Sequence, residues 1–212
     1  MSCRSSALAL FAVPLAFSFA LTSCQDGNDP AATTPPSESP ATSSPTASLS
    51  PTKSQPPKPV PASAEGPAKN IPVPEMPDAA KQNSKNGAIS FAEHYFEVVN
   101  YSIATTTTDE LKKLTSRQCK LCAEQLIDPI DAAVDIKAWQ VGGEYDYDFV
   151  DLLEPVDNKA VAIFNFDAAA QKLYREPHKV LKTWERVNHQ VVSFELKFTK
   201  DWEVTKIVIP KN

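Results

Sequence analysis

The chain has 212 residues, a formal net charge of −5 at pH 7 and 19 prolines, 14 of which lie between Pro30 and Pro77. The acidic balance, without a basic cluster in the sequence, argues against nucleic acid as a partner. The three histidines, His94, His178 and His189, do not have the spacing of metal ligands. The sequence therefore predicts neither a metal nor a cofactor.

Residues 1–23 have the pattern of a bacterial lipoprotein signal peptide. Arg4 supplies a positive charge, and the apolar run 7–21 is shorter than the roughly 20 residues that span a membrane. The run ends in Leu21-Thr22-Ser23-Cys24, which matches the lipobox at which a peptidase cuts before an acylated cysteine. We predict that acyl chains such as palmitate on Cys24 anchor the mature protein to the extracytoplasmic face of the cell membrane. The alternative is an ordinary secretory signal with a chance cysteine.

Residues 24–74 are rich in Pro, Ser, Thr and Ala and have no hydrophobic periodicity. Such a segment cannot bury enough apolar surface to offset the entropy of ordering it. We predict a disordered tether. Its Ser and Thr residues next to Pro would permit O-glycosylation.

Residues 75–212 have the length of one globular domain. Asp78 or Ser84 can cap a long amphipathic helix, because apolar residues recur at helical spacing from residue 89 to residue 103. One stripe of this helix contains Ile89, Ala92, Phe96, Val99 and Ile103, and Phe91, Tyr95 and Val98 lie beside it.

Two further helices are predicted after the first. The β-branched run Thr105 to Thr108 should end the first helix, and Thr108 can cap a short one that contains Leu111 and Leu114. A third helix is predicted from Ser116, with a break or kink at Pro129, which has no backbone N–H. Its predicted face contains Cys119, Cys122, Leu126, Ile130 and Val134.

After Trp139 the hydrophobic period changes from 3.6 to 2. Gly142-Gly143 predicts a turn, and residues 145–149 predict a strand with an aromatic face and an acidic face. Residues 160–166 are almost continuously apolar, which predicts a central strand covered on both faces. Residues 190–198 and 202–209 predict a closing hairpin. Helices followed by an antiparallel sheet define an α+β domain.

Cys119 and Cys122 are the thiols that remain on the exported domain once the signal is removed and Cys24 is acylated. Outside the membrane, two cysteines three residues apart are predicted to form a disulfide. Two alternatives are a redox-active pair at a helix start, which requires a preceding strand, and half of a zinc site.

The order of elements resembles the ketosteroid-isomerase-like cone, also called nuclear-transport-factor-like, in which a curved sheet closes around a helix. Short motifs of the domain are Met76-Pro77, Ala80-Lys81, Gly87-Ala88, Phe91, Asn100-Tyr101-Ser102, Cys119-x-x-Cys122 and Gly142-Gly143. These motifs resemble an actinobacterial family of exported lipoproteins whose C-terminal domain has no assigned function. Thr105 to Thr108 departs from the glycine-containing break of that family. The resemblance implies the fold and a location in the cell envelope. It implies no enzymatic activity.

Charge is distributed unevenly along the domain. Residues 128–157 contain nine acidic residues and one lysine, whereas residues 158–212 contain ten basic and six acidic residues. The acidic run could be a calcium site, but it lacks the glycine and the terminal glutamate spacing of a calcium loop. A solvated strand edge is the favoured interpretation. The run consists of Glu144, Asp146, Asp148, Asp151 and Glu154.

If the fold is a cone, its wide end should be an open pocket. We expect Tyr95, Trp139, Asp167, Tyr174 and Trp184 to line it. The predicted function is a binding or scaffold module whose partner is an envelope protein or an apolar ligand. One alternative is an isomerase-like or hydrolase-like enzyme with Asp167 as its base. Another is that the aromatic side chains only fill the core.

Overall fold

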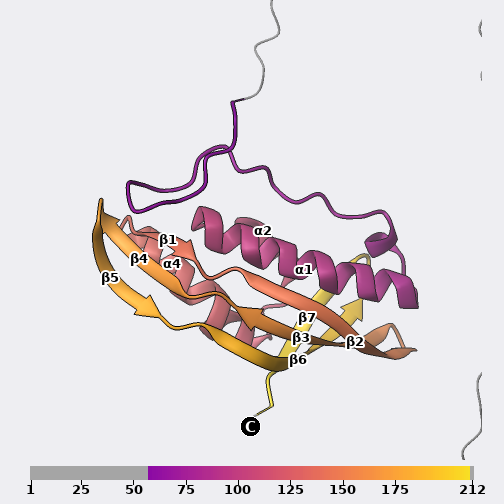
Figure 1. Ribbon diagram of the computed structural model, residues 1–212. Coiled ribbons are helices and arrows are strands. Elements are labelled where there is room, and N and C mark those ends of the chain that lie inside the picture. The colour runs from indigo at the N-terminus through magenta and orange to yellow at the C-terminus, as the bar shows by residue number, and fades with distance from the viewer. Residues whose placement is uncertain (1–56, 211–212) are drawn as a thin grey trace, which may run out of the picture. The chain divides into compact units, whose positions relative to one another are not determined.

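The computed structural model describes residues 57–210, which form an N-terminal hairpin, a helical half and a sheet half (Figure 1). The lipobox at Cys24 and the tether up to residue 56 lie outside the described residues. No helix in the described part is long and apolar enough to cross a membrane. The helices precede the strands, and both sheets are antiparallel, so the α+β prediction is confirmed.

The long helix α1 (Lys85–Thr105) follows a 3₁₀ turn, η1 (Ala79–Lys81). Ser84 caps it, because its hydroxyl accepts a hydrogen bond from the N–H of Gly87 at 3.0 Å. Gly87 is required there, since a Cβ at this position would lie 2.0 Å from the carbonyl oxygen of Gln82. The predicted apolar stripe of α1 faces the core.

The threonine run ends α1 as predicted. Thr106 adopts the left-handed conformation, with φ of 54°, which a β-branched residue rarely occupies. The N–H of Thr107 donates to Ser102 O at 3.1 Å, and the Thr106 hydroxyl accepts from the N–H of Gln140 at 3.3 Å. Thr106 thus takes the conformation in which helices commonly place a glycine. The short helix α2 (Asp109–Leu114) follows.

The third helix is divided into three parts: α3 (Lys120–Cys122), the π-helical turn η2 (Ala123–Ile127) and α4 (Asp128–Asp135). The N–H of Asp128 donates to Ala123 O, five residues back. The break predicted at Pro129 is confirmed, and it lies just before the proline. One residue of the predicted buried face differs, because Val134 at the end of α4 is exposed.

Seven strands form two sheets of order β1-β4-β5 and β2-β3-β6-β7. Strands β4 and β5 were not predicted, because most of their side chains are exposed and give no apolar alternation. The strands are β1 (Trp139–Gly142), β2 (Tyr145–Val156), β3 (Lys159–Ala168), β4 (Gln171–Glu176), β5 (Lys179–Trp184), β6 (Val187–Phe198) and β7 (Trp202–Val208).

The two sheets are the halves of one bent layer. Two residues separate β1 from β2, β3 from β4, and β5 from β6. At the bend Gly142 has φ of 75°, and a Cβ there would lie 2.3 Å from Ala170 O. The N–H of Ala169 donates to Glu144 O at 2.9 Å across the bend. The predicted single curved sheet is thus split in two where the glycine pair kinks it.

Strand β3 is central, between β2 and β6. Its Phe164 and Phe166 face α1, where Phe96 packs edge-on against Phe164 at 5.3 Å and stacks on Tyr147 at 4.3 Å between ring centroids. The prediction that this strand is covered on both faces was wrong. Its other face is half-exposed or exposed, since helices lie against one side of the layer only.

Residues 57–74, which the sequence assigned to the tether, have a defined conformation. Val60 and Lys69 exchange two backbone hydrogen bonds of 2.8 Å, forming a hairpin. Its tip is held by the sheet: Trp139 Nε1 donates to Ser63 O at 2.7 Å, and the His178 N–H donates to Ala64 O at 2.8 Å. These long-range bonds order a segment whose composition lacks any signal for folding.

Candidate functional site

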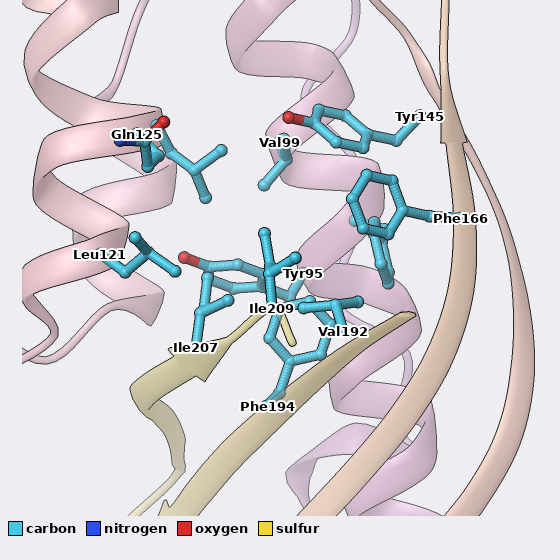
Figure 2. Close-up of a pocket in the computed structure, with 12 residues that line it drawn as sticks. Tyr95, Val99, Leu121, Gln125, Tyr145, Phe166, Val192, Phe194, Ile207 and Ile209 are labelled. Atoms are coloured by element: carbon cyan, nitrogen blue, oxygen red, sulfur yellow. The ribbon is translucent and has the colours of Figure 1, made fainter. Parts of the chain in front are cut away.

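An apolar cavity of about 130 Å³ lies between α1, the α3–η2 segment and the concave face of the larger sheet (Figure 2). Helix α1 contributes one wall, Leu121 and the π-helical turn a second, and β3, β6 and β7 the third. The lining residues are Tyr95, Phe96, Val99, Leu121, Gln125, Leu126, Tyr145, Phe166, Val192, Phe194, Ile207 and Ile209.

The polar groups of this cavity are the Gln125 amide and two phenols. Figure 2 shows the hydroxyls of Tyr95 and Tyr145 directed toward the helix that bears Leu121 and Gln125. Burial raises the pKa of Tyr95 and the pKa of Tyr145. Both side chains therefore stay neutral at physiological pH and can act as hydrogen-bonding groups.

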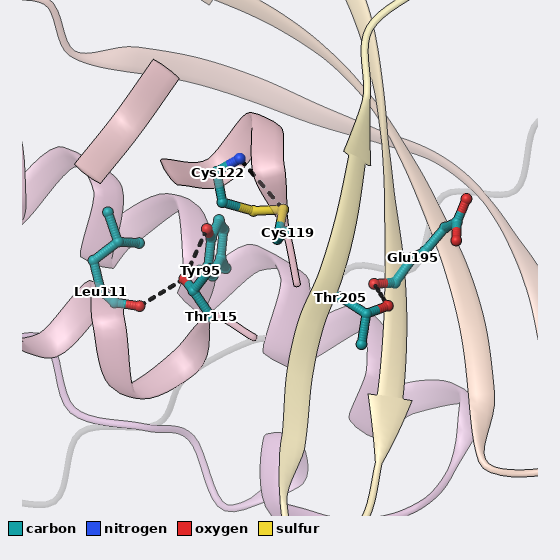
Figure 3. The surroundings of a disulfide bond; sticks show 7 residues. All are labelled: Tyr95, Leu111, Thr115, Cys119, Cys122, Glu195 and Thr205. Carbon is teal, nitrogen blue, oxygen red and sulfur yellow. Dashed lines mark hydrogen bonds between the residues drawn. A yellow bond between two sulfur atoms is a disulfide. The ribbon is translucent and has the colours of Figure 1, made fainter. Parts of the chain in front are cut away.

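The Tyr95 hydroxyl has a defined role as a donor. Thr115 Oγ1 donates its one hydrogen to Leu111 O at 2.7 Å, so it must accept from the Tyr95 hydroxyl, which lies 3.1 Å away (Figure 3). The Tyr95 oxygen keeps its acceptor capacity. Tyr95 thus offers a fixed acceptor at the edge of the apolar cavity.

Tyr145 is fixed by its backbone. Its N–H donates to Asn100 Oδ1 at 2.8 Å, and its carbonyl accepts from Asn100 Nδ2 at 2.9 Å. Its ring packs against Phe166 at 5.3 Å between centroids. These contacts hold the first residue of β2 at the boundary between the two halves of the bent sheet.

A second cavity, of about 340 Å³, adjoins the first, and Gln125, Leu126 and Tyr145 line both. Its remaining lining is more polar and lies around the bend. Gln171 Nε2 donates to Gln140 Oε1 across this lining. The residues that line only the second cavity are Ile103, Pro129, Ile130, Gln140, Gly143, Ala168, Ala169, Gln171, Leu173, Trp184, Glu185 and Val187.

The five predicted pocket residues do not converge on one site. Tyr95 lines the first cavity and Trp184 the second. Trp139 and Tyr174 are buried, stack on each other and contact the N-terminal hairpin through Trp139. Asp167 faces the opposite side of the sheet. The prediction of one shared pocket was wrong, because the bend and the twist of the strands separate these residues.

Asp167 belongs to an open hollow on the outer face, with Asp146, Asp148, Asn165 and His189. Its Oδ1 accepts the backbone N–H of His189 at 2.7 Å. This location removes it from either cavity and from the predicted role as a base there. Within residues 57–210, no group of three or more His, Cys, Asp or Glu side chains could hold a metal ion.

Sequence reasoning missed the contribution of the third helix. Leu121, Gln125 and Leu126 line the first cavity, and two of them lie in the π-helical turn. Such turns are rare and frequently occur at functional sites. Pro129 predicted a break in the third helix. It did not predict that Leu121, Gln125 and Leu126 line the cavity.

Cys119 and Cys122 form a disulfide with Cα atoms 5.3 Å apart (Figure 3). Cys119 is 2% exposed and Cys122 is 0% exposed. An attacking thiolate needs access to one sulfur, so burial favours a structural role over redox exchange. The bridge spans Leu121 and thereby helps to fix one wall of the cavity.

Comparisons with known proteins give one family and one distant structure. No curated protein matches the sequence. Among solved structures, the chain is similar to the crystal structure of the intermembrane space region of the chloroplast protein ARC6, with 12% identity and a TM-score of 0.39 over 59% of this chain and 95% of that chain. The model of the family of unknown function DUF6318 matches residues 57–207. This chain therefore belongs to the DUF6318 family.

Proposed function

We propose that this chain is a membrane-anchored lipoprotein of the cell surface whose domain binds an amphipathic small molecule in the two adjoining cavities. The observation that carries the proposal is the gradient of polarity between them. The first cavity is lined almost entirely by apolar and aromatic side chains, and the second adds Gln140, Gln171 and Glu185.

The sizes of the cavities support a ligand with two parts. The first, at about 130 Å³, is close to the apolar cavity of about 150 Å³ that accommodates benzene in another protein. The second, at about 340 Å³, lies within the range of small-molecule sites. A ring or short acyl segment would occupy the first, and a polar group would reach the amides of the second.

Binding is favoured over catalysis by the available side chains. Among the residues that line the two cavities, Glu185 alone has a carboxylate side chain, and it lines the second, more polar cavity. Tyr95 and Gln125 supply hydrogen bonds rather than a matched acid and base. The arrangement suits recognition of a ligand that joins an apolar part to a polar part.

The proposed location rests on Leu21-Thr22-Ser23-Cys24. We also propose that the chain is related to exported actinobacterial lipoproteins and that its domain has the fold of the ketosteroid-isomerase-like cone. A bent sheet with α1 on its concave side, and cavities between the two, is consistent with that cone. A lipid-anchored binding module of this kind would hold its ligand at the membrane surface.

The test uses 1-anilinonaphthalene-8-sulfonate, an aromatic probe with one anionic group whose fluorescence rises in apolar sites. Val99 lines the first cavity, whereas the adjacent Val98 lines a separate hollow on another side of α1. They are 3% and 1% exposed, which makes them a matched pair. Val99→Phe should weaken probe binding at least about tenfold by filling the cavity, and Val98→Phe should leave it within about twofold.

Urea unfolding of both variants separates a filled cavity from a disrupted fold. Overpacking costs about 1–3 kcal/mol in each case, so comparable stability with different probe binding supports the proposal. Equal probe binding by the wild type and Val99→Phe would place the probe elsewhere and overturn it.

A further inference from the structure

Positive charge is concentrated in two segments of the described chain. Residues 57–70 and 171–187 together contain seven Lys or Arg and three Glu, a net charge of +4. The other described residues contain eleven Lys or Arg and twenty Asp or Glu, a net charge of −9. All seven basic side chains of the two segments are exposed. They are Lys58, Lys69, Lys172, Arg175, Lys179, Lys182 and Arg186.

The fold brings these two segments together, although about 100 residues of sequence separate them. The hairpin tip accepts a hydrogen bond from the His178 N–H, at the turn between β4 and β5, and another from Trp139 on β1. Figure 1 shows the hairpin reaching the β4–β5 end of the sheet. We call the exposed surface of residues 57–70 and 171–187 the basic end.

The basic end also has exposed apolar side chains on an edge strand. Within the described sheets, β5 pairs with β4 alone. Its Val180 is 44% exposed and its Leu181 is 52% exposed. The basic end therefore combines basic and apolar side chains on an exposed edge. The outer face of the larger sheet is instead acidic, with Asp146, Asp148 and Asp167.

The described chain begins at the base of the hairpin, and the tip of the hairpin reaches the β4–β5 end of the sheet (Figure 1). The hairpin base, where Asn70 Nδ2 donates to Lys58 O at 3.3 Å, directly follows the segment that leads back to Cys24. Cys24 precedes residue 57 by 33 residues. A lipid on Cys24 would therefore be joined to the domain through the hairpin, whose residues 57–70 are part of the basic end.

We propose that the basic end docks on a membrane surface that contains anionic phospholipids. This inference rests on the proposed anchoring through Cys24, which brings the surface within reach. Each Lys or Arg close to an anionic surface strengthens binding by roughly fivefold, and Val180 and Leu181 would contact the region of the headgroups. The two cavities would then be held in a fixed orientation relative to the membrane surface.

A second copy of the chain is an alternative partner, because its acidic part is complementary in charge to the basic end. The membrane is favoured because a lipid on Cys24 would be joined to the domain through residue 57, which belongs to the basic end. Association between copies is an outcome of the experiment described next.

The test uses the unacylated chain from residue 25 to residue 212 and sedimentation with phosphatidylcholine vesicles that contain or lack phosphatidylglycerol. Arg175→Glu with Lys182→Glu removes two basic charges from the basic end. Lys159→Glu with Lys197→Glu makes the same change in net charge at the opposite end of the bent layer, where these two exposed residues pair across β3 and β6. Circular dichroism checks that both double variants are folded.

The wild type and the Lys159/Lys197 variant should sediment with anionic vesicles, weakly with neutral ones, and lose this binding in about 0.5 M salt because screening shortens the interaction. The Arg175/Lys182 variant should bind at least about 25-fold more weakly. Equal loss in both variants, or equal binding to neutral vesicles, would overturn the proposal. Sedimentation without vesicles would replace it with association between copies. Because the chain lacks acyl groups, failure here leaves anchoring through Cys24 unaffected.

Discussion

Trp139 and Tyr174 stack with ring centroids 5.8 Å apart and an angle of 16° between their planes. They lie directly opposite each other on β1 and β4. The indole N–H of Trp139 donates to Ser63 O at 2.7 Å, so this buried pair also holds the N-terminal hairpin. This relationship explains why the domain begins before residue 75.

Tyr174→Ala should destabilise the domain by about 3–5 kcal/mol, as truncations of large buried aromatic residues do. Tyr174 is buried and would leave Trp139 without its stacking partner. Urea unfolding measures the loss. Tyr101→Ala is the control, because Tyr101 is half-buried and should cost less. A loss below about 1 kcal/mol for Tyr174→Ala would restore the open-pocket interpretation.

Cys24→Ala should abolish labelling of the protein by radioactive palmitate and release it from the membrane or stall its export, because we propose that this thiol carries the acyl chain. Cys3→Ala is the matched control, since Cys3 lies in the predicted signal peptide, residues 1–23. Labelling should be unchanged in that variant. Palmitate incorporation that persists without Cys24 would contradict the assignment of the lipid anchor.

The Cys119–Cys122 disulfide should persist in the exported protein. After denaturation, alkylation without reductant should add no mass to these residues, whereas alkylation after reduction should add two labels. Replacing both with Ala should cost about 2 kcal/mol through the lost constraint on the unfolded chain. Recovery of a doubly alkylated species from envelope without reductant would instead indicate free thiols and support metal or redox chemistry.

Tyr95→Phe should change how stability depends on alkaline pH. Burial raises the pKa of Tyr95 above its ordinary value of 10, so the unfolded chain loses this proton first and the stability contribution is lost as pH rises above 10. Between about pH 9 and about pH 11.5, the variant should lose about 2 kcal/mol less stability than the wild type.

Urea unfolding at several pH values measures this difference. At neutral pH the variant should be about 1 kcal/mol less stable, because the hydrogen bond to Thr115 is lost. The difference in slope isolates Tyr95, since Tyr145 and Tyr147 are present in both proteins. Identical slopes would mean that solvent reaches the Tyr95 hydroxyl in the folded state.

Much of the helical half could be predicted from the sequence. The spacing of apolar residues defined α1, Ser84 marked its start, and the threonine run marked its end. Local steric and hydrogen-bonding preferences act over one or two turns, so they can be read directly from neighbouring residues. The same applies to the strands whose apolar residues alternate, from Tyr145 to Phe149 and from Gln190 to Phe198.

The hairpin at residues 57–70 and strands β4 and β5 were not predictable in this way. Their residues are mostly polar or proline, and their order depends on partners such as Trp139 and on pairing with β1, distant in sequence. Long-range hydrogen bonds leave no periodic signal in either segment.

The sequence by itself determined the cysteine pair, the α+β order and the apolar face of α1, because each depends on local composition or period. Only the tertiary structure decided which aromatic side chains share a cavity. Strand pairing places Phe166 at the first cavity and Asp167 on the outer face, and the π-helical turn brings Gln125 and Leu126 to both cavities. A one-residue change of phase at a bend moves a side chain to the opposite face, and that phase depends on packing between segments far apart in the chain.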